Sequence, residues 1–466
     1  MNGLDELTRE ELMALVLKLH ETVQAQAKRI VELEGIVQQQ AERISQLEEE
    51  ISKLSGPKGK PAWVKPNVVK KEDATRKQRM QSFARKTLPA TQVQYHVVEN
   101  CPDCGRKLSG GSVKWRRQTV DIPPVKVEVT DHLFVERRCG VCGKRCVPDV
   151  NEVLGDWVVG KRTVGIRLMS LIAYLKTVCR LPVGLIRRLL ESLYGVKISA
   201  GEIVELVHAV AEIGHGEYVG LLDRVRGSPV VHGDETGWRE DGKNGYLWSF
   251  STPDVRYFVY RHSRAGTVVS EVLGDEFEGA LVSDFYGGYN IYDGIKQRCW
   301  VHYLRDLKDL VEKNPDDARV SSWVEAVKSV YWRARETVKL EHSEVDRRKL
   351  RQGFESELLT LAQPYLNSKK APQRVLAKRI DNFLGELFSF VQWPEIPSEN
   401  NAAERAIRPA VIARKVSGGT RSERGSNTST TLRSLFGTWA LRQADCLEVC
   451  RQMIIQANRQ PTPSRP

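Results

Sequence analysis

The first regular pattern in the chain is a seven-residue repeat of apolar positions between residues 16 and 54. One position of the repeat always holds a β-branched residue: Val16, Val23, Ile30, Val37, Ile44 and Ile51. The position three residues later holds Leu19, Gln26, Leu33, Gln40, Leu47 and Leu54. β-Branched residues at the first position with leucine at the second favour a parallel two-stranded coil. The pattern predicts a coiled-coil dimerisation segment over residues 1–54. The alternative is a long amphipathic helix that packs on its own chain.

A second helical region is expected over residues 160–215. Pro182 begins one helix, because proline is tolerated in a first turn, and Gly195 ends it. Ser199 and Glu202 form a capping box that begins the next helix. Two helices joined by a short turn containing glycine match a helix-turn-helix. We expect either a DNA-binding helix-turn-helix or a plain helical subdomain.

The next part of the chain predicts a group of strands, two of which, at residues 245–250 and 255–260, show alternating apolar and polar residues. Three strands are expected at residues 229–238, 245–250 and 255–260, followed by a helix at about 266–273 and a strand at 279–284. This order is that of an RNase H-like core, in which the first and fourth strands are neighbours.

The first and fourth of these strands are each expected to end in a carboxylate, Asp234 and Asp284. Neighbouring strands would hold the two carboxylates side by side. Such a pair is unfavourable unless a proton or a cation neutralises it. Mg²⁺ prefers oxygen ligands, so a hard divalent metal fits best.

A third carboxylate is expected on a helix that begins after Pro397. Ser398 is a plausible N-cap, and Glu404 would lie about a turn and a half inside the helix. Glu399 is the rival candidate. It lies at the start of the helix, where compensation of the helix dipole is a sufficient role.

The segment between the last two carboxylates shows helical periodicity with almost no strand-like alternation. Pro315, Pro364 and Pro372 are expected to break it into separate helices. The expected division of this half of the chain is a first core part, an all-helical insertion, a second core part and a disordered tail: residues 225–302, 303–393, 394–456 and 457–466.

Two Cys-x-x-Cys pairs precede the helical region. Cys101, Cys104, Cys139 and Cys142 supply four thiolates, the ligand set of a closed structural zinc site. We expect a zinc ribbon over residues 101–150, with an inserted strand at 118–130. Cys146 is a spare that would either replace Cys142 or bind nothing. The alternative is a reduced set of cysteines without metal.

Composition and charge narrow the class of protein. The 466 residues include 71 Lys and Arg against 59 Asp and Glu, a net charge of +12 that indicates an anionic partner. No apolar run approaches the ~20 residues that span a bilayer. The N-terminus has neither the basic nor the apolar region of a signal peptide. Residues 55–100 hold ten Lys and Arg against three Asp and Glu, so we expect a flexible basic linker, either simply solvated or in contact with phosphates.

Three stretches carry a resemblance to a known family. They are His232–Arg239, Cys299–His302 and Glu399–Pro409, with Arg414-Lys415 beyond. In these stretches and in the order of its parts, the chain resembles the insertion sequence 66 family of bacterial DDE transposases. The family often has Asp where this chain has Glu399. The resemblance implies that Asp234, Asp284 and Glu404 form the DDE triad.

The fold expected from pattern and resemblance together is a multidomain α+β protein. It has an N-terminal coiled coil, a zinc ribbon, a helical segment that resembles a helix-turn-helix, and an RNase H-like core with an all-α insertion. The expected cofactors are Mg²⁺ or Mn²⁺ at the triad and structural Zn²⁺ at the cysteines. The two-metal mechanism would serve both hydrolysis and strand transfer. The expected phosphate contacts are Arg405, Arg408, Arg414 and Lys415.

The expected partners are transposon ends, target DNA and a second copy of the chain, without a membrane, in the bacterial cytoplasm and associated with the nucleoid. Two other functions remain open. One is a metal-dependent nuclease without strand transfer. The other is a catalytically silent, domesticated DNA-binding protein. The chain contains no phosphate-binding Gly-x-x-x-x-Gly-Lys-[Ser/Thr] loop, which argues against an ATPase.

Overall fold

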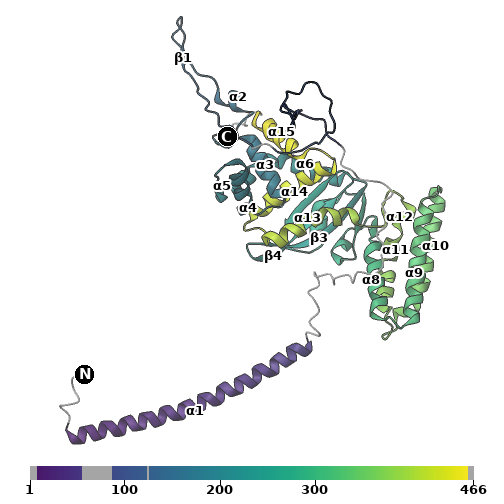
Figure 1. The fold of residues 1–466 in the computed structure, drawn as a ribbon. Helices are drawn as coiled ribbons and strands as arrows, with labels where there is room; N and C mark the ends of the chain where they lie inside the picture. The colour runs from purple at the N-terminus through teal and green to yellow at the C-terminus, as the bar shows by residue number, and fades with distance from the viewer. Residues whose placement is uncertain (1–7, 55–86, 123–124, 460–466) are drawn as a thin grey trace. The chain divides into compact units, whose positions relative to one another are not determined.

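The computed structural model describes residues 8–54, 87–122 and 125–459 (Figure 1). Most of the predicted basic linker and the last seven residues of the predicted tail lie outside these ranges. The chain divides into two units, residues 1–120 and 121–466, and each is described by itself.

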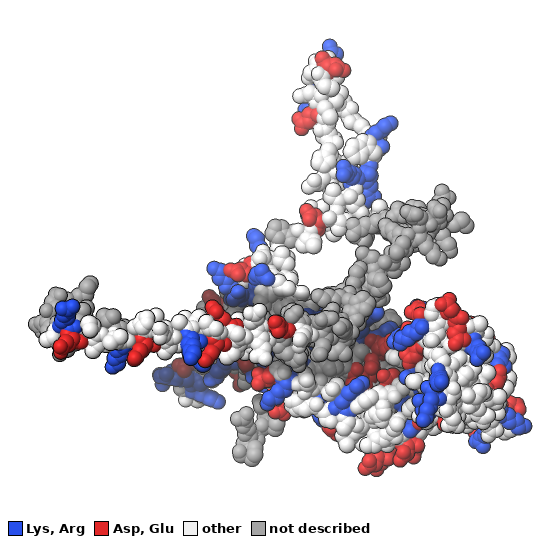
Figure 2. All heavy atoms as spheres, turned by 90° about the horizontal axis from the view of Figure 1, so that it is seen from below, with Lys and Arg blue, Asp and Glu red and all other residues white. Residues whose placement is uncertain are grey.

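The first unit contains one long helix, α1 (Arg9–Leu54). Acidic and basic side chains alternate along this rod (Figure 2), and Arg29 and Glu32 pair at 2.9 Å. Apolar side chains of the seven-residue repeat are exposed on α1, and those described are Val23, Ile30, Leu33 and Val37. The predicted helix is therefore present with its apolar stripe open to solvent, while its pairing with a second copy stays a prediction.

The prediction of a strand at residues 118–130 is wrong. The described residues of this stretch pair with no other strand, and Val125, Val127 and Val129 are exposed. Alternation of apolar and polar residues gives a chain two different faces, but a strand also needs a partner edge for its hydrogen bonds. The small sheet that is present joins β1 (Arg137–Arg138) to β2 (Arg145–Cys146) as an antiparallel pair.

A five-stranded sheet forms the centre of the second unit (Figure 1), in the order β5-β4-β3-β6-β7. The first three strands in sequence pair antiparallel, β6 pairs parallel to β3, and β7 pairs parallel to β6. The bounds are β3 (Val230–Glu240), β4 (Lys243–Ser251), β5 (Arg256–Arg261), β6 (Ala280–Ser283) and β7 (Lys296–Arg298). The four predicted strands are thus present and β7 is additional.

Helices cover both faces of the sheet. The helix α13 (Asn401–Ser417) packs on one face, where Ala410 lies against Trp238, Leu247 and Phe258. The opposite face supports the main hydrophobic core, formed with helices that precede β3, with the helix between β5 and β6, and with the C-terminal helices. These helices are α3 (Ile166–Thr177), α4 (Val183–Tyr194), α5 (Ala200–Ile213), α6 (His215–Arg226), α7 (Thr267–Leu273), α14 (Glu423–Leu441) and α15 (Cys446–Arg459). The remaining short elements are α2 (Val150–Leu154) and the 3-10 helix η1 (Gly287–Ile291).

Several predicted helix ends are confirmed. Pro182 is the N-cap of α4, and Gly195 ends that helix with a φ of 67°. The Ser199 hydroxyl accepts a hydrogen bond from the Glu202 N–H and so caps α5. The last helix, α15, continues to Arg459 and so includes the first residues of the predicted tail.

The helix α14 closes the free edge of the sheet at β5. The Phe258 N–H donates to the Ser434 hydroxyl at 2.8 Å, and the Arg256 N–H donates to the Thr438 hydroxyl at 3.0 Å. Hydroxyls four residues apart on a helix match N–H groups two residues apart on a strand, since both repeats span about 6–7 Å. The edge is therefore satisfied by side chains and is not available for pairing with another strand.

The segment between β7 and α13 is entirely helical. It forms α8 (Trp300–Lys313), α9 (Ala318–Val338), α10 (Glu344–Leu366), α11 (Arg374–Leu387) and α12 (Ser389–Gln392), which enclose a hydrophobic core of their own. Pro315 and Pro372 lie between helices as predicted, but Pro364 does not break α10. It lies two residues from the end of that helix, where few backbone bonds remain to be lost. No helix among the described residues is long and apolar enough to cross a membrane.

Candidate functional site

The strands β3 and β6 bring Asp234 and Asp284 together. Val230, Val231 and His232 pair with Ala280, Leu281 and Val282 in parallel register. Each aspartate therefore lies two residues beyond the last pair on its own strand. The prediction that β3 ends at Asp234 is wrong, because the strand continues to Glu240 through its pairing with β4.

Asp234 occupies an acidic and largely buried environment. Burial, the largest cause, and the nearby charges of Glu235, Asp284 and Glu404 together raise the pKa of its carboxyl group to about 7. One oxygen of Asp234 accepts the Glu235 N–H at 2.9 Å. A carboxylate whose pKa is raised by neighbouring carboxylates is the arrangement that a bound cation stabilises.

Glu404 comes from α13, on the same side of the sheet as Asp234. Its N–H donates to the Asn400 carbonyl at 3.2 Å, so it lies in the first turn of the helix rather than a turn and a half inside. Its Oε1 atom is buried and has no hydrogen-bond partner among the described residues. Glu399 is half-buried just before the helix, and its charge contributes to the raised pKa of Tyr331 in the helical insertion, for which burial is the larger cause.

The prediction that Ser398 is the N-cap of this helix is wrong. The helix is preceded instead by Asn400, and the Ser398 hydroxyl lies 3.2 Å from the Tyr331 hydroxyl. The Asn400 side chain is used elsewhere. Its Nδ2 donates to the Gly233 carbonyl at 2.6 Å, and its Oδ1 accepts from His232 Nδ1 at 3.0 Å. Asn400 thus ties the start of α13 to the residues that precede Asp234.

Cys299 and His302 also lie at this helix start. The Cys299 sulfur accepts the Asn400 N–H at 3.2 Å, and the Cys299 N–H donates to the Ser283 carbonyl at 2.8 Å. His302 Nδ1 lies 3.6 Å from Glu404 Oε1. Ligand atoms of Cys299, His302 and Glu404 lie within 4.8 Å of one another. A buried nitrogen facing a buried oxygen at this separation can orient the carboxylate.

Glu235 is a carboxylate that the sequence did not single out. Side chains alternate along a strand, so Glu235 points to the opposite face from Asp234. There it accepts hydrogen bonds from Tyr289 Oη at 2.6 Å and from Arg264 Nη2 at 2.6 Å. A carboxylate whose oxygens are engaged in this way supports the sheet rather than serving as an open ligand.

The four predicted phosphate contacts are placed differently along α13. Arg405, Arg408 and Lys415 are exposed. Arg414 is half-buried, and its Nη1 donates to the Thr236 hydroxyl at 3.1 Å and to the Gly237 carbonyl. The guanidinium of Arg414 therefore holds α13 against β3, and three cations remain open to solvent.

The two cysteine pairs form loops of the same shape. In the first, the Cys101 N–H donates to the Arg106 carbonyl at 2.8 Å; in the second, the Cys139 N–H donates to the Lys144 carbonyl at 2.8 Å. The glycine after each pair has a positive φ, 68° and 72°. Backbone N–H groups of each loop lower the pKa of its first cysteine, led by those of Cys104 and Cys142. Each loop therefore favours the thiolate form, which is the form that binds zinc.

A family model described as "Transposase IS66 family" matches residues 161–428, more than half of the chain. The chain belongs to this family. The matched range contains Asp234, Asp284 and Glu404. A second model, for the zinc-finger binding domain of transposase IS66, matches residues 99–143 and contains both cysteine pairs. Membership of the IS66 family and the presence of its zinc-finger domain confirm the resemblance seen in the sequence.

One curated relative of this IS66 family member is an uncharacterized protein, y4jO, of Sinorhizobium fredii (strain NBRC 101917 / NGR234). It is 32% identical over 170 residues, which make up 36% of this chain and 49% of the relative. The matched part of the chain thus spans about half the length of that relative.

Proposed function

We propose that this protein is a DNA transposase that binds the ends of an insertion sequence and catalyses metal-dependent cleavage and strand transfer. The observation that carries the proposal is the meeting of Asp234, Asp284 and Glu404 on one side of the sheet in a member of the IS66 transposase family. The strand order β5-β4-β3-β6-β7, with three antiparallel strands and two parallel ones, supports an RNase H-like core.

The residues at this site fit a hard divalent cation. Oxygen ligands converge there, the pKa of Asp234 is raised by burial and by its acidic neighbours, and Glu404 Oε1 is buried without a hydrogen-bond partner among the described residues. Asp234, Asp284 and Glu404 would hold Mg²⁺ or Mn²⁺. Two ions held there would supply Lewis acidity and would activate an oxygen nucleophile, either water or a DNA 3′-hydroxyl.

The protein's own residues position these ligands and the DNA. Asn400 and Arg414 hold the two halves of α13 on β3, which fixes Glu404 opposite Asp234. Arg405, Arg408 and Lys415 would contact phosphates from the exposed face of that helix. Arg414 would strengthen the local positive potential while it remains bonded to the strand. Phosphate contacts of this kind supply affinity that falls with salt but no sequence information.

The cysteine region and α1 would complete the DNA-binding assembly. Cys101, Cys104, Cys139 and Cys142 would hold one structural Zn²⁺, consistent with the match to the zinc-finger domain. The exposed apolar stripe of α1 would pair with that of a second copy, and the resulting dimer would bring two transposon ends together.

The test is incubation of the full-length protein with Mg²⁺, duplexes that carry its element's ends, and a target plasmid. The wild type is expected to give joined products. Asp284→Asn and Glu404→Gln should reduce cleavage and joining by about a thousandfold or more while binding the same duplexes. Glu399→Gln is the matched control, because a charge before a helix start contributes only about 0.3–1 kcal/mol to stability.

Four other outcomes would overturn parts of this proposal. Full activity of Asp284→Asn would reject the triad. Loss of activity in Glu399→Gln with activity kept in Glu404→Gln would make Glu399 the third ligand. Cleavage without joining in the wild type would indicate a nuclease. Metal-independent binding without cleavage would indicate a DNA-binding protein without catalysis.

A further inference from the structure

Arg298 is a buried cation between the catalytic strand and the helical insertion. It is the last residue of β7, and its side chain is 0% exposed. A guanidinium taken out of water is costly unless its donors are satisfied and its charge is paired. The groups that bind the Arg298 guanidinium therefore indicate the role of this residue.

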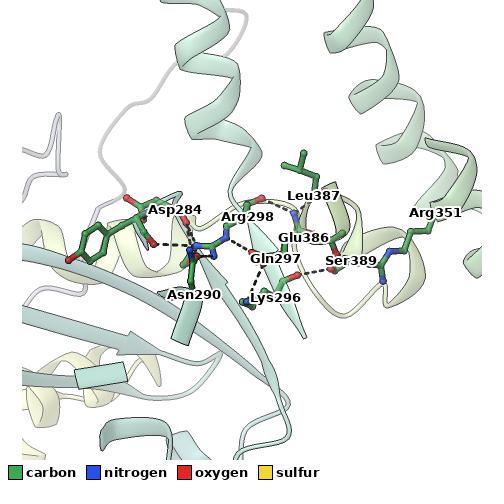
Figure 3. Close-up of polar contacts among 12 residues, drawn as sticks. Asp284, Asn290, Lys296, Gln297, Arg298, Arg351, Glu386, Leu387 and Ser389 are labelled. Carbon is green, nitrogen blue, oxygen red and sulfur yellow. Dashed lines mark hydrogen bonds and ion pairs between the residues drawn. The ribbon is translucent and has the colours of Figure 1, made fainter. Parts of the chain in front are cut away.

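One side of the guanidinium binds the loop that begins with Asp284 (Figure 3). Its Nη1 donates to the Asp284 carbonyl at 2.8 Å and to the Ser283 hydroxyl at 3.1 Å, and its Nη2 donates to Asn290 Oδ1 at 2.5 Å. Within the same loop, Asp284 Oδ1 accepts the Tyr286 N–H at 2.9 Å. The backbone position of Asp284 and the direction of its carboxylate are thus set together.

The other side of the guanidinium binds α11 of the insertion. Its Nε donates to Glu386 Oε2 at 2.5 Å, and its central carbon lies 4.7 Å from the ring centre of Phe383. The helix is interrupted at Phe383, where φ is −122° and ψ is 18°. Glu386 also pairs with Lys296 of β7 at 3.1 Å (Figure 3). The only carboxylate that neutralises Arg298 among the described residues therefore comes from the insertion.

We propose that Arg298 is a positioning residue that couples the placement of α11 to that of Asp284. The inference rests on the proposed role of Asp284 as a metal ligand. The planar guanidinium of arginine has five N–H donors and can bind the loop and the insertion at once, whereas the compact ammonium group of lysine cannot. A displacement of α11 would shift the Glu386 carboxylate, and Arg298 would carry that shift to Asp284.

The experiment measures Mn²⁺ binding to the full-length protein by electron paramagnetic resonance, together with end cleavage. Arg298→Lys keeps the charge and is expected to weaken Mn²⁺ affinity about tenfold or more, as loss of partners behind metal ligands does. Its kcat for cleavage should fall while its KM for DNA stays unchanged. Glu386→Gln should shift both quantities in the same direction by a smaller factor.

Arg351→Lys is the matched control. Arg351 of α10 also binds this corner of the insertion, through the Gly385 carbonyl at 2.6 Å and Gln392 Oε1 at 2.9 Å, but its contacts do not reach the Asp284 loop (Figure 3). Its substitution should leave Mn²⁺ affinity unchanged. An equal loss in Arg351→Lys would overturn the proposal, because it would show a general effect of the insertion.

The proposal for Arg298 would also be overturned if the Arg298→Lys variant folds and has the Mn²⁺ affinity and the cleavage rate of the wild type. If Arg298→Lys does not fold, wild-type values in Glu386→Gln would have the same consequence. Failure of the proposed function would show in the wild type itself, which would then bind Mn²⁺ no better than Asp284→Asn.

Discussion

The cysteine loops and the carboxylate site differ in how far apart along the chain their parts lie. Each cysteine loop closes over a few consecutive residues, with its own backbone N–H groups directed to sulfur. The carboxylate site takes Asp234 from β3, Asp284 from the end of β6 and Glu404 from α13, with the helical insertion between the last two. A local loop forms its ligand shape from its own sequence. The carboxylate site needs a folded sheet, a docked helix and residues such as Asn400 that join them.

This difference predicts that zinc loss and core stability separate. Cys101→Ser or Cys142→Ser removes one of the four thiolates and should abolish binding of the one Zn²⁺ expected per chain. Only the cysteine region should lose stability, because structural zinc contributes about 10 kcal/mol or more to the folding of such modules. Thermal unfolding of the sheet and its helices should be unchanged. Metal analysis by mass spectrometry and calorimetry would measure both quantities.

Cys146→Ser is the matched control for zinc, since Cys146 is an exposed cysteine just beyond the second loop. It should retain the metal. Zinc kept in Cys142→Ser and lost in Cys146→Ser would assign the fourth ligand to Cys146. A purified protein without zinc, prepared without chelator, would contradict the site altogether.

The carboxylate site should make the metal-free protein less stable as the pH rises. Below about pH 4 Asp234 is protonated in both the folded and the unfolded chain. Between its unfolded pKa of 3.8 and its folded pKa of about 7, the unfolded chain loses the proton and the folded chain keeps it. The penalty is complete above pH 7, on the order of 4 kcal/mol at about 1.4 kcal/mol per pKa unit.

Asp234→Asn should remove this penalty. Its free energy of unfolding relative to the wild type should increase by about 3 kcal/mol between about pH 4.5 and pH 8 in urea titrations without added divalent metal. Added Mg²⁺ should stabilise the wild type at pH 8 and leave the variant unchanged. A stability difference that is independent of pH would show that the carboxylates do not interact as described.

The predicted coil is a third case, since its pattern is local but its expected partner is a second copy of the chain. Ile30→Pro should disrupt α1 at a cost of about 3 kcal/mol per helix, and the variant should be a monomer in analytical ultracentrifugation where the wild type is expected to be a dimer. Ile30→Leu keeps an apolar side chain at the same position and should remain dimeric. A wild-type protein that is monomeric at micromolar concentration would contradict the coiled coil.

Sequence patterns predicted the elements whose signals are local, and missed what depends on contacts between them. The strands that lead to Asp234 and Asp284 contain short apolar runs, which are recognisable from the local sequence. The three residues of β7 are too few to alternate, so Arg298 had no signal. At the start of α13, serine and asparagine are both good caps, and only the contacts of Asn400 with β3 decide between them. The wrong strand at residues 118–130 is the opposite case, a clear pattern without a partner.

The smallest expected effect concerns His302, which faces Glu404. His302 Nδ1 lies 3.6 Å from Glu404 Oε1, and both atoms are buried without hydrogen-bond partners among the described residues. A side chain that only orients a ligand contributes less than the ligand itself. His302→Asn should therefore lower the cleavage rate by about tenfold, or about 1.4 kcal/mol, with DNA affinity unchanged.

A second histidine–glutamate pair provides the control for His302. His262 Nε2 lies 3.3 Å from Glu240 Oε1, at the far end of β3 from the carboxylates. His262→Asn should cleave at the wild-type rate in the same assay. If both variants cleave like the wild type, Glu404 is held by α13 alone. If both lose activity equally, the loss reflects a general effect on folding rather than the orientation of the Glu404 carboxylate by His302.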